Sequence, residues 1–370
     1  MKRNSLEPKF FGRSARAVRR NSGIALIIAM VAVTVLSILA AGFAISMKTE
    51  TKLAQNAESE ENLIWLGRSG VEYARWILSQ QSSIAGEPYD ALNQIWAGGP
   101  GGPGETNSVL AGVSLDNVPL GDGTISIKII DLERKVNINT VNGQMLQQAL
   151  TLMGVDADQI SVVADSIQDW VQPGDSPRLA GAKSDYYQTL DPPYYCKDAP
   201  MDDLSELLLV KGVTPDMYFG TGAVNHESKF THKLGFGSSP DDTPDYPFGL
   251  RDIFTTISSG QININTAGTN VLQMIPGVDA ETAANIIQQR AGPDGVEGTD
   301  DDTPFRNVNQ LSQAGVNPQI VGQIGRVCTT RSRTFEVHVT ARVGDYSREY
   351  VATLFRNSGT DIQVLTFYWK

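Results

Sequence analysis

Cysteine is scarce in this chain of 370 residues. Only Cys196 and Cys328 occur, too few for a disulfide-built scaffold and too far apart in sequence for a CxxC metal or redox site. In an oxidising compartment the two can pair, and two free buried thiols are the other possibility. The sequence leaves both alternatives open.

Histidine is equally rare, and catalytic motifs are missing. The chain contains His226, His232 and His338 but no HExxH pattern, no Gly-x-Ser-x-Gly sequence and no phosphate-binding loop. Surface or capping roles are favoured for the three histidines. We therefore expect no enzymatic activity.

Positive charge is also in short supply. The formal net charge is −11, and residues 136–325 carry 24 acidic side chains against nine basic ones. Nucleic-acid binding depends on Lys and Arg that neutralise phosphates, so this balance argues against a nucleic-acid partner.

One long apolar run organises the chain. Residues 24–47 carry no charge, and at about 1.5 Å per residue they can cross a ~30 Å hydrocarbon layer as one helix. Seven basic residues and one acidic residue precede the run, so the positive-inside rule predicts a single-pass inner-membrane protein with a cytoplasmic N-terminus and a periplasmic bulk. A secretory signal peptide cleaved near Ala40-Ala41-Gly42 is the alternative, but its apolar core would be shorter.

The remaining periodicity predicts one long helix and a sheet. Apolar residues and Gly70 recur at helical spacing as far as residue 79, and the glycine- and proline-rich residues 98–104 read as a flexible loop. Alternating or β-branched segments at 124–130, 334–342, 347–355 and 362–369 predict antiparallel strands, with turns at Asp122-Gly123 and Gly344-Asp345.

An internal repeat lies between the predicted strands. Residues 136–140 read Val-Asn-Ile-Asn-Thr, and residues 262–266 read Ile-Asn-Ile-Asn-Thr. A Leu, a Gly-Val-Asp triplet and a second helical pattern follow each copy, and the segments 200–207 and 304–311 also correspond. Each copy predicts a small helical unit in which Asn and Thr cap the first helix and a glycine turn reverses the chain.

The fold class that follows is α+β, with a long N-terminal helix that resembles the helix of a pilin, an antiparallel sheet and a large inserted all-α domain. The two repeats of that insertion resemble SAM-like or helix-hairpin-helix modules. The expected segments are a basic leader (1–23), the membrane half of the helix (24–47), the first α/β part (48–135), the insertion (136–325, with repeats at about 136–220 and 262–325) and the closing strands (326–370).

The ordered set of features resembles a known family. A basic leader ending in Gly23, an apolar helix, a split sheet and two Asn-Ile-Asn-Thr repeats are together similar to general secretion pathway protein K, the large minor pseudopilin of type II secretion. Residues 175–181, 185–187, 190–194 and 208–212 look especially like that family. The resemblance covers the chain from Ser22 onward.

The resemblance implies processing and partners. Prepilin peptidase would cut between Gly23 and Ile24, and Ile24 would be N-methylated. The expected partners are other minor pseudopilins, the major pseudopilin and the inner-membrane secretion platform, with secreted cargo as a further candidate. The expected place is the pseudopilus tip, where the protein would initiate assembly and support export across the outer membrane.

Ile28 sharpens this expectation. Most pilins carry Glu as the fifth mature residue, where its carboxylate neutralises the terminal ammonium of a neighbour, because unpaired charge in lipid is costly. The equivalent residue here is Ile28. This departure is typical of the protein K family and suits a subunit with one axial neighbour.

Two acidic segments are candidate calcium sites. Asp294, Glu297, Asp300, Asp301 and Asp302 combine oxygen ligands with glycines that permit tight wrapping, although the spacing is not that of an EF-hand. The equivalent connection of the first repeat supplies Asp169, Asp175 and Asp185. The resembled family is associated with calcium in this domain, and solvated acidic turns are the alternative.

Two other functions fit part of the pattern. Helix-hairpin-helix modules bind DNA phosphates elsewhere, so a membrane-anchored DNA receptor is one alternative, but the predicted turns carry Asp156, Asp158, Asp279 and Glu281. A minor pilin of a type IV pilus is the other.

Overall fold

The computed structural model describes residues 22–220 and 246–370. The basic leader up to residue 21, together with His226 and His232, lies outside the described residues. The chain divides into two compact units, Met1–Glu61 and Asn62–Lys370.

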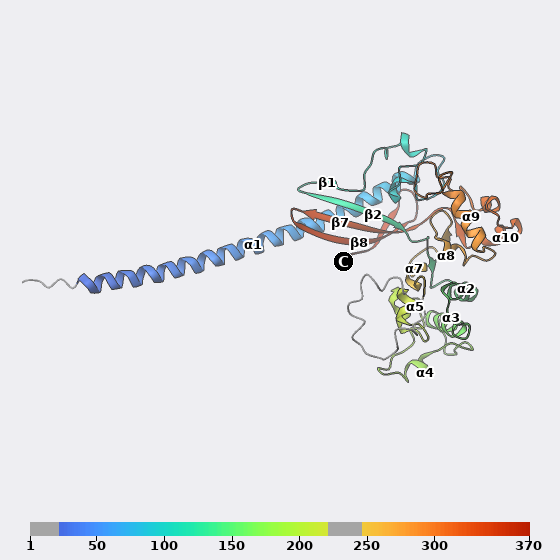
Figure 1. The fold of residues 1–370 in the computed structure, drawn as a ribbon, viewed down its shortest axis with the longest axis horizontal. Helices are drawn as coiled ribbons and strands as arrows, with labels where there is room; N and C mark the ends of the chain where they lie inside the picture. The colour runs from blue at the N-terminus through green and yellow to red at the C-terminus, as the bar shows by residue number, and fades with distance from the viewer. Residues whose placement is uncertain (1–21, 221–245) are drawn as a thin grey trace, which may run out of the picture. The chain divides into compact units, whose positions relative to one another are not determined.

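The predicted N-terminal helix is a single element, α1, Ser22–Ser82. It forms the blue ribbon of Figure 1 and crosses the boundary between the two units. In the first unit the apolar side chains from Ile24 to Leu53 are all exposed, whereas in the second unit Leu63, Leu66 and Ile77 are buried. The first half of this continuous helix is therefore exposed and apolar, whereas its second half contributes side chains to a core.

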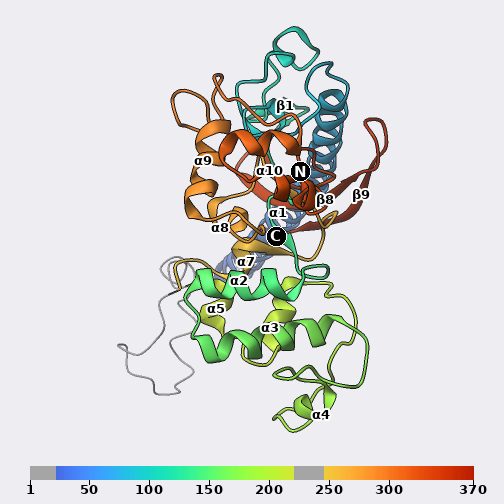
Figure 2. The same ribbon diagram turned by 90° about the vertical axis from the view of Figure 1, so that its right-hand side faces the viewer.

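The sheet of the second unit has five antiparallel strands in the order β1-β2-β7-β8-β9. Strands β1, β2, β7 and β8 are labelled in Figure 1, and β9 is labelled in Figure 2. The predicted antiparallel sheet is thus present, and it also contains the short edge strand β1. The bounds are β1 Val118–Leu120, β2 Gly123–Asp131, β7 Thr334–Val343, β8 Tyr346–Arg356 and β9 Ile362–Trp369.

The first hairpin turn lies one residue earlier than predicted. Leu120 pairs with Gly123, so the loop residues are Gly121 and Asp122 rather than Asp122 and Gly123. Gly121 has φ +57°, a left-handed conformation that favours glycine, and this places the turn.

Two glycines of α1 let the helix lie close to the sheet. A Cβ atom at Gly67 would come within 2.4 Å of the Tyr350 ring, and one at Gly70 within 2.4 Å of Val339 Cγ1. Both neighbours are buried on strands β7 and β8. The helix and the sheet enclose the smaller of two hydrophobic clusters, which includes Ile127 on β2.

The glycine- and proline-rich loop is tied to the protein rather than free. Buried Glu105 accepts a hydrogen bond from the backbone of Gly102, and buried Glu87 accepts one from Gly104. The glycines are needed for this packing, because a Cβ at Gly102 would meet Glu87 Oε1 at 2.5 Å. Short 3-10 helices flank the loop, η1 Ile95–Ala97 and η2 Glu105–Asn107.

The segment between β2 and β7 contains short helices in two groups. The elements of the first group are β3 Val136–Asn137, α2 Gly143–Met153, α3 Ala157–Val171, α4 Ser184–Tyr187, η3 Leu204–Leu209, α5 Pro215–Phe219, α7 Leu250–Ile253 and β4 Phe254–Thr255. Those of the second are β5 Ile262–Asn263, α8 Thr269–Leu272, α9 Ala280–Arg290, η6 Val308–Ala314, α10 Pro318–Ile324 and β6 Cys328–Thr329. Figure 2 shows α2 and α3 lying alongside each other.

Each group closes with a parallel strand pair. β3 pairs with β4, and β5 pairs with β6. Their buried side chains belong to the larger hydrophobic cluster, which runs from Val136 to Cys328 in sequence. The turns between successive helices contain Gly154 at φ +82° and Gly277 at φ +80°, as the Gly-Val pattern predicts.

Candidate functional site

The apolar half of α1 is the first candidate functional element. Among the described residues, α1 is the one helix that is long and apolar enough to cross a membrane, and none of its most apolar stretch is buried. A buried core helix would pass the same length test, but it would not expose Ile27, Leu36 and Phe43. The helix therefore fits a single-pass anchor.

Hydroxyl groups in and near this stretch are satisfied within the helix. Thr34 Oγ1 donates to the carbonyl oxygen of Met30 at 2.8 Å, and Ser37 Oγ donates to that of Val33 at 2.7 Å. Thr49 makes the same kind of contact with Ile45. Such bonds suit a helix in hydrocarbon, where polar groups find no water.

The expected processing point lies at the start of α1. Gly23 belongs to the first turn of the helix, and the side chain of Ile24 is exposed. Ile28 is exposed as well, and it leaves the apolar stretch without a carboxylate. Cleavage between Gly23 and Ile24 stays a prediction.

The Asn-Ile-Asn-Thr segments do not cap helices as the sequence suggested. The N-cap of α2 is Asn142, whose side chain accepts from the Met145 N–H, and the N-cap of α8 is Gly268, which makes no side-chain cap bond. The side-chain N–H groups of these Asn residues donate to groups far away in sequence instead, because each segment begins in a short strand that turns before its helix.

The second Asn of each segment forms a reciprocal pair. Asn139 donates to the carbonyl oxygen of Met201 at 3.0 Å and accepts from its N–H at 2.7 Å. Asn265 donates to the carbonyl oxygen of Phe305 at 2.9 Å and accepts from its N–H at 2.8 Å. The internal repeat is therefore also present in the hydrogen-bond pattern.

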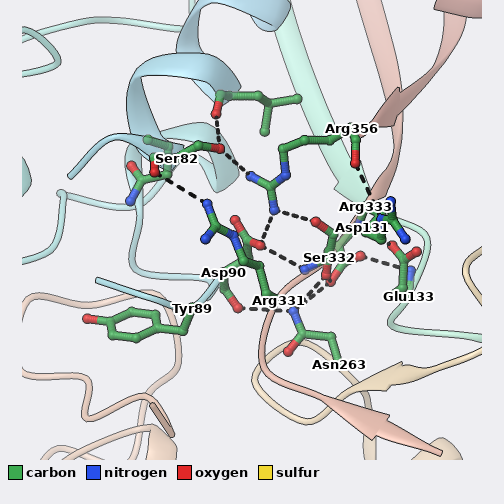
Figure 3. A network of polar contacts seen from close by, with 12 residues as sticks. Ser82, Tyr89, Asp90, Asp131, Glu133, Asn263, Arg331, Ser332, Arg333 and Arg356 are labelled. Carbon is green, nitrogen blue, oxygen red and sulfur yellow. Dashed lines mark hydrogen bonds and ion pairs between the residues drawn. The ribbon is translucent and has the colours of Figure 1, made fainter. Parts of the chain in front are cut away.

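The first Asn of the second segment enters a buried polar junction (Figure 3). The Nδ2 group of Asn263 donates to the carbonyl oxygen of Asp90 at 3.0 Å, to Asp131 Oδ2 at 3.0 Å and to Ser332 Oγ at 2.8 Å. Ser332 Oγ donates to Asp131, and its N–H donates to Asp90. The junction joins the second helical group to the end of β2, to the segment before β7 and to the loop after α1.

An ion pair crosses this junction. Arg356, at the end of β8, bonds through its guanidinium to the Asp90 carboxylate and to the Ser332 carbonyl. Its Nη1 also donates to Ser82 Oγ at the end of α1. Both charged side chains are buried, so losing either would leave the other without its partner.

Asp131 is the most perturbed carboxyl of the junction. Burial, followed by the nearby Glu133 carboxylate, raises the pKa of Asp131 to about 7. Hydrogen bonds from Ser332 and Thr266 oppose this rise. Glu133 accepts bonds from Ser259, Thr334 and the Arg333 backbone, so it too is fully engaged.

The first candidate calcium segment forms a compact loop after α9. Glu297 pairs with the buried Arg290, and Asp301 accepts from the Asp294 N–H at 3.0 Å. Asp302 accepts from the Gly298 N–H at 2.8 Å, while Asp300 is exposed. Burial raises the pKa of Asp302, and Glu297 contributes to the rise.

In the second candidate segment, basic side chains hold the acidic one. The carboxylate of buried Asp169 accepts from the Arg178 guanidinium and from the Arg178 backbone N–H, both at 2.9 Å. Lys183 Nζ donates to the backbone carbonyl oxygen of Asp169 at 2.6 Å. Asp175 and Asp185 are exposed. Within residues 22–220 and 246–370 no group of three or more His, Cys, Asp or Glu side chains is placed to hold a metal. Calcium therefore stays a prediction.

Comparison with known proteins tests the family. The family model described as "Type II secretion system (T2SS), protein K" matches residues 127–219. "Type II secretion system protein K" of Pseudomonas aeruginosa is 25% identical over 359 residues, covering 94% of this chain and 92% of the relative. The protein of the same name from Klebsiella pneumoniae is 24% identical over 54% of this chain and 60% of its own.

A solved structure has the same fold. It is described as the GspK-GspI-GspJ complex from the type 2 secretion system of enterotoxigenic Escherichia coli, and one of its chains aligns with a TM-score of 0.58 and 18% identity. The match covers 86% of this chain and 99% of that chain.

The chain is similar to type II secretion system protein K over nearly its whole length. The resemblance seen in the sequence is thereby confirmed, and with it the role of a minor pseudopilin. Neither a DNA receptor nor a type IV minor pilin is favoured.

The two cysteines of the chain are buried in the larger core cluster, and both are free thiols in the structure. Cys196 Sγ lies 3.6 Å from the carbonyl oxygen of Asp169 in the first helical group, and Cys328 lies on β6, which pairs with β5. A disulfide between Cys196 and Cys328 stays a prediction.

Sequence reasoning missed the buried junction. Asp90 and Arg356 are 266 residues apart and lie in no motif. One signal was available for Asp131, because it continues the two-residue alternation of Ile125, Ile127 and Ile129 toward the buried face of β2. An acidic residue at a core position requires buried partners.

Proposed function

We propose that this minor pseudopilin sits at the tip of the type II pseudopilus, initiates its assembly and supports protein export across the outer membrane. The similarity to protein K of Pseudomonas aeruginosa over nearly the whole length of both chains carries the proposal. The role is one of assembly and does not call for catalysis.

Ile28 supports a terminal position. A subunit inside a filament has neighbours on both sides, and a carboxylate near the start of its helix neutralises the ammonium of a neighbour in lipid. This chain has isoleucine there, so it can offer its own terminal ammonium to a neighbour but has no carboxylate for the ammonium of another neighbour. A subunit at the end of a filament has one axial neighbour and therefore needs only one of these two groups.

The bulk of the helical groups supports the same position. Their shared hydrophobic cluster spans Val136 to Cys328 in sequence, larger than the cluster between α1 and the sheet. We infer that the two groups are SAM-like repeats inserted into the pilin-like unit. Such a volume is easier to accommodate at a filament end than between stacked subunits.

The proposed partners are other minor pseudopilins. The solved relative was described in a complex of GspK, GspI and GspJ, and we propose an equivalent complex here. Ala29, Ala32 and Ala41 on the apolar half of α1 are small enough to let partner helices approach closely. The major pseudopilin, the secretion platform, prepilin peptidase and secreted cargo are further proposed partners.

The proposed location is the inner membrane, with residues 24–47 as the span. The basic leader would stay in the cytoplasm and the second unit would face the periplasm, in accord with the positive-inside rule.

Co-purification and labelling test the proposal. Full-length protein in detergent should elute with the other minor pseudopilins of the same system, and label on this chain should mark one end of each pseudopilus. The substitution A41L should weaken the complex by crowding the helix contact, whereas V35L, which enlarges a side chain that is already large, should not. Label distributed along the filament would contradict the tip position.

A further inference from the structure

A polar pocket with an arginine-rich lining lies beside the buried junction. Its volume is about 360 Å³, and its lining comes from Gln261 before β5, from Thr329 on β6, from the segment between β6 and β7, and from the end of β8 with the loop that follows. Three of its nine lining residues are arginines, and none is acidic. In a chain with a net charge of −11, such a lining is unusual.

Two of the arginines have most of their donors available. Arg331 makes one guanidinium hydrogen bond, a long one of 3.4 Å to the Ser82 carbonyl oxygen. Arg333 makes one of 3.5 Å to the carbonyl oxygen of Arg356, and its guanidinium lies over the Phe355 ring, 5.2 Å from the ring centroid, which leaves its other N–H groups available. Both side chains are exposed. Neither pairs with a carboxylate in the described ranges 22–220 and 246–370, although a guanidinium carries five N–H donors.

The wall of the pocket is rigid and positively charged. Arg356 lines it from the buried side, where the ion pair with Asp90 fixes the guanidinium (Figure 3). Buried Ser332 also lines the pocket. The rim comes from the β8–β9 loop, where Ser358 presents a hydroxyl and the Asn357 amide is held by the exposed Asp361.

Carboxylates behind the wall weaken the positive potential without abolishing it. Asp90, Asp131 and Glu133 accept hydrogen bonds from interior donors and do not line the pocket. The Asp90 charge is matched by Arg356, and the pKa of Asp131 near 7 leaves that group partly neutral. Arg331 and Arg333 line the pocket itself, so a ligand in the pocket would meet their positive charges first.

We propose that this pocket binds a carboxylate side chain from an acidic segment of another protein chain, through the guanidinium groups of Arg331 and Arg333. The planar fork of arginine matches a carboxylate with two parallel bonds. A volume of about 360 Å³ falls at the lower end of pockets that hold organic ligands, which is more room than a free inorganic anion fills. The contact adds a charge-based site to the helix contacts by which partners would bind.

A binding assay with a defined probe tests the proposal. The full-length protein in uncharged detergent is titrated with a fluorescent tetraglutamate peptide, with tetraglutamine as the neutral peptide and inorganic phosphate as a competitor. We expect the acidic peptide to bind, the neutral one to fail, and the affinity to fall as salt rises. The double variant R331Q/R333Q should bind at least about tenfold more weakly.

Matched variants separate charge from folding. Arg342 is exposed at the far end of β7 and does not line the pocket, so R342Q should bind like the unchanged protein. R331K/R333K keeps the charge but loses the fork, and it should bind with intermediate affinity. Equal melting temperatures would show that all variants fold. Unchanged binding by R331Q/R333Q, no peptide binding at millimolar concentration, or binding of phosphate alone would overturn the proposal.

Discussion

Asn139 and Asn265 occupy equivalent positions in the two helical groups, and each exchanges a pair of hydrogen bonds with the backbone of one distant residue. The partner is Met201 for the first and Phe305 for the second. Each amide fixes the chain segment that returns to the start of its own group. The second Asn of the repeated motif thus ties two chain segments together within each group.

Removing the side chain of Asn265, the more buried of the two Asn residues, should lower the stability of the folded protein. In N265A the backbone N–H and C=O of Phe305 lose their partners in a dry environment, and we expect the free energy of unfolding to fall by about 2–4 kcal/mol. N139A should cost about 1 kcal/mol, because Asn139 is half-buried and water can replace it. Chemical denaturation of the purified protein measures both. The exposed N309A is the control, and equal losses in all three would contradict the account.

Two glycine substitutions should have opposite effects. G70A places a methyl group within 2.4 Å of Val339 and should destabilise the protein by about 1–3 kcal/mol through overpacking. G322A lies in α10 with no atom within 4 Å of the added Cβ, and it should stabilise by up to about 1 kcal/mol. Thermal unfolding compares the two. A neutral G70A would show that the α1 contact with the sheet can relax.

Much of the fold could be predicted because it rests on local periodicity. The uncharged run predicts α1, the two-residue alternation predicts β2 and β7, and the Asn-Ile-Asn-Thr copies predict two similar helical groups. These patterns repeat within a few residues, so a single sequence displays them.

The junction could not be predicted because its members are far apart in sequence and have no common spacing. Asp131 gives a weak local signal, but Arg356 and Asp90 give none. The wrong assignment of helix caps has a similar origin. Asn139 looks like a cap residue, and only the tertiary structure shows that its amide bonds to Met201 instead.

Stability should decrease as pH rises through neutrality. Burial raises the pKa of Asp131 and of Glu105 to about 7, so between about pH 4 and pH 7 the folded state binds more protons than the unfolded chain. The contribution of these two carboxyl groups to the stability of the folded state is fully present below about pH 4 and is lost as the pH rises through 7. Bonds to Glu336 and Glu349 raise the pKa of His338, so its contribution is also lost as the pH rises.

The variant D131N removes the group that contributes most to this fall in stability with rising pH. Its melting temperature should depend less on pH between 5 and 8, because the group that takes up the proton is gone. D122N, at an exposed position, should keep the original slope. Calorimetry at a series of pH values measures both. An unchanged slope in D131N would mean that Asp131 does not titrate in this range.

Calcium binding would stabilise the folded protein by mass action. If the loop at residues 294–302 binds the ion, a chelator should lower the melting temperature, and excess calcium should restore it. D300A should reduce the shift, whereas D175N should not, because Arg178 already pairs with the Asp169 carboxylate in the other segment. A chelator without effect would leave both segments as solvated turns.

Processing at Gly23 provides the most direct test of the N-terminus. We expect the mature chain to begin at Ile24 and to carry one added methyl group, which N-terminal sequencing and intact mass can establish. G23V should block cleavage and retain the leader, whereas G42A should be processed normally, since no atom lies within 4 Å of the added Cβ. A start near Phe43 would indicate an ordinary signal peptide, and the exposed apolar half of α1 would then be absent from the mature protein. A start at Met1 would leave seven basic residues attached to the helix, which would hold its end in the cytoplasm and prevent its transfer into a filament.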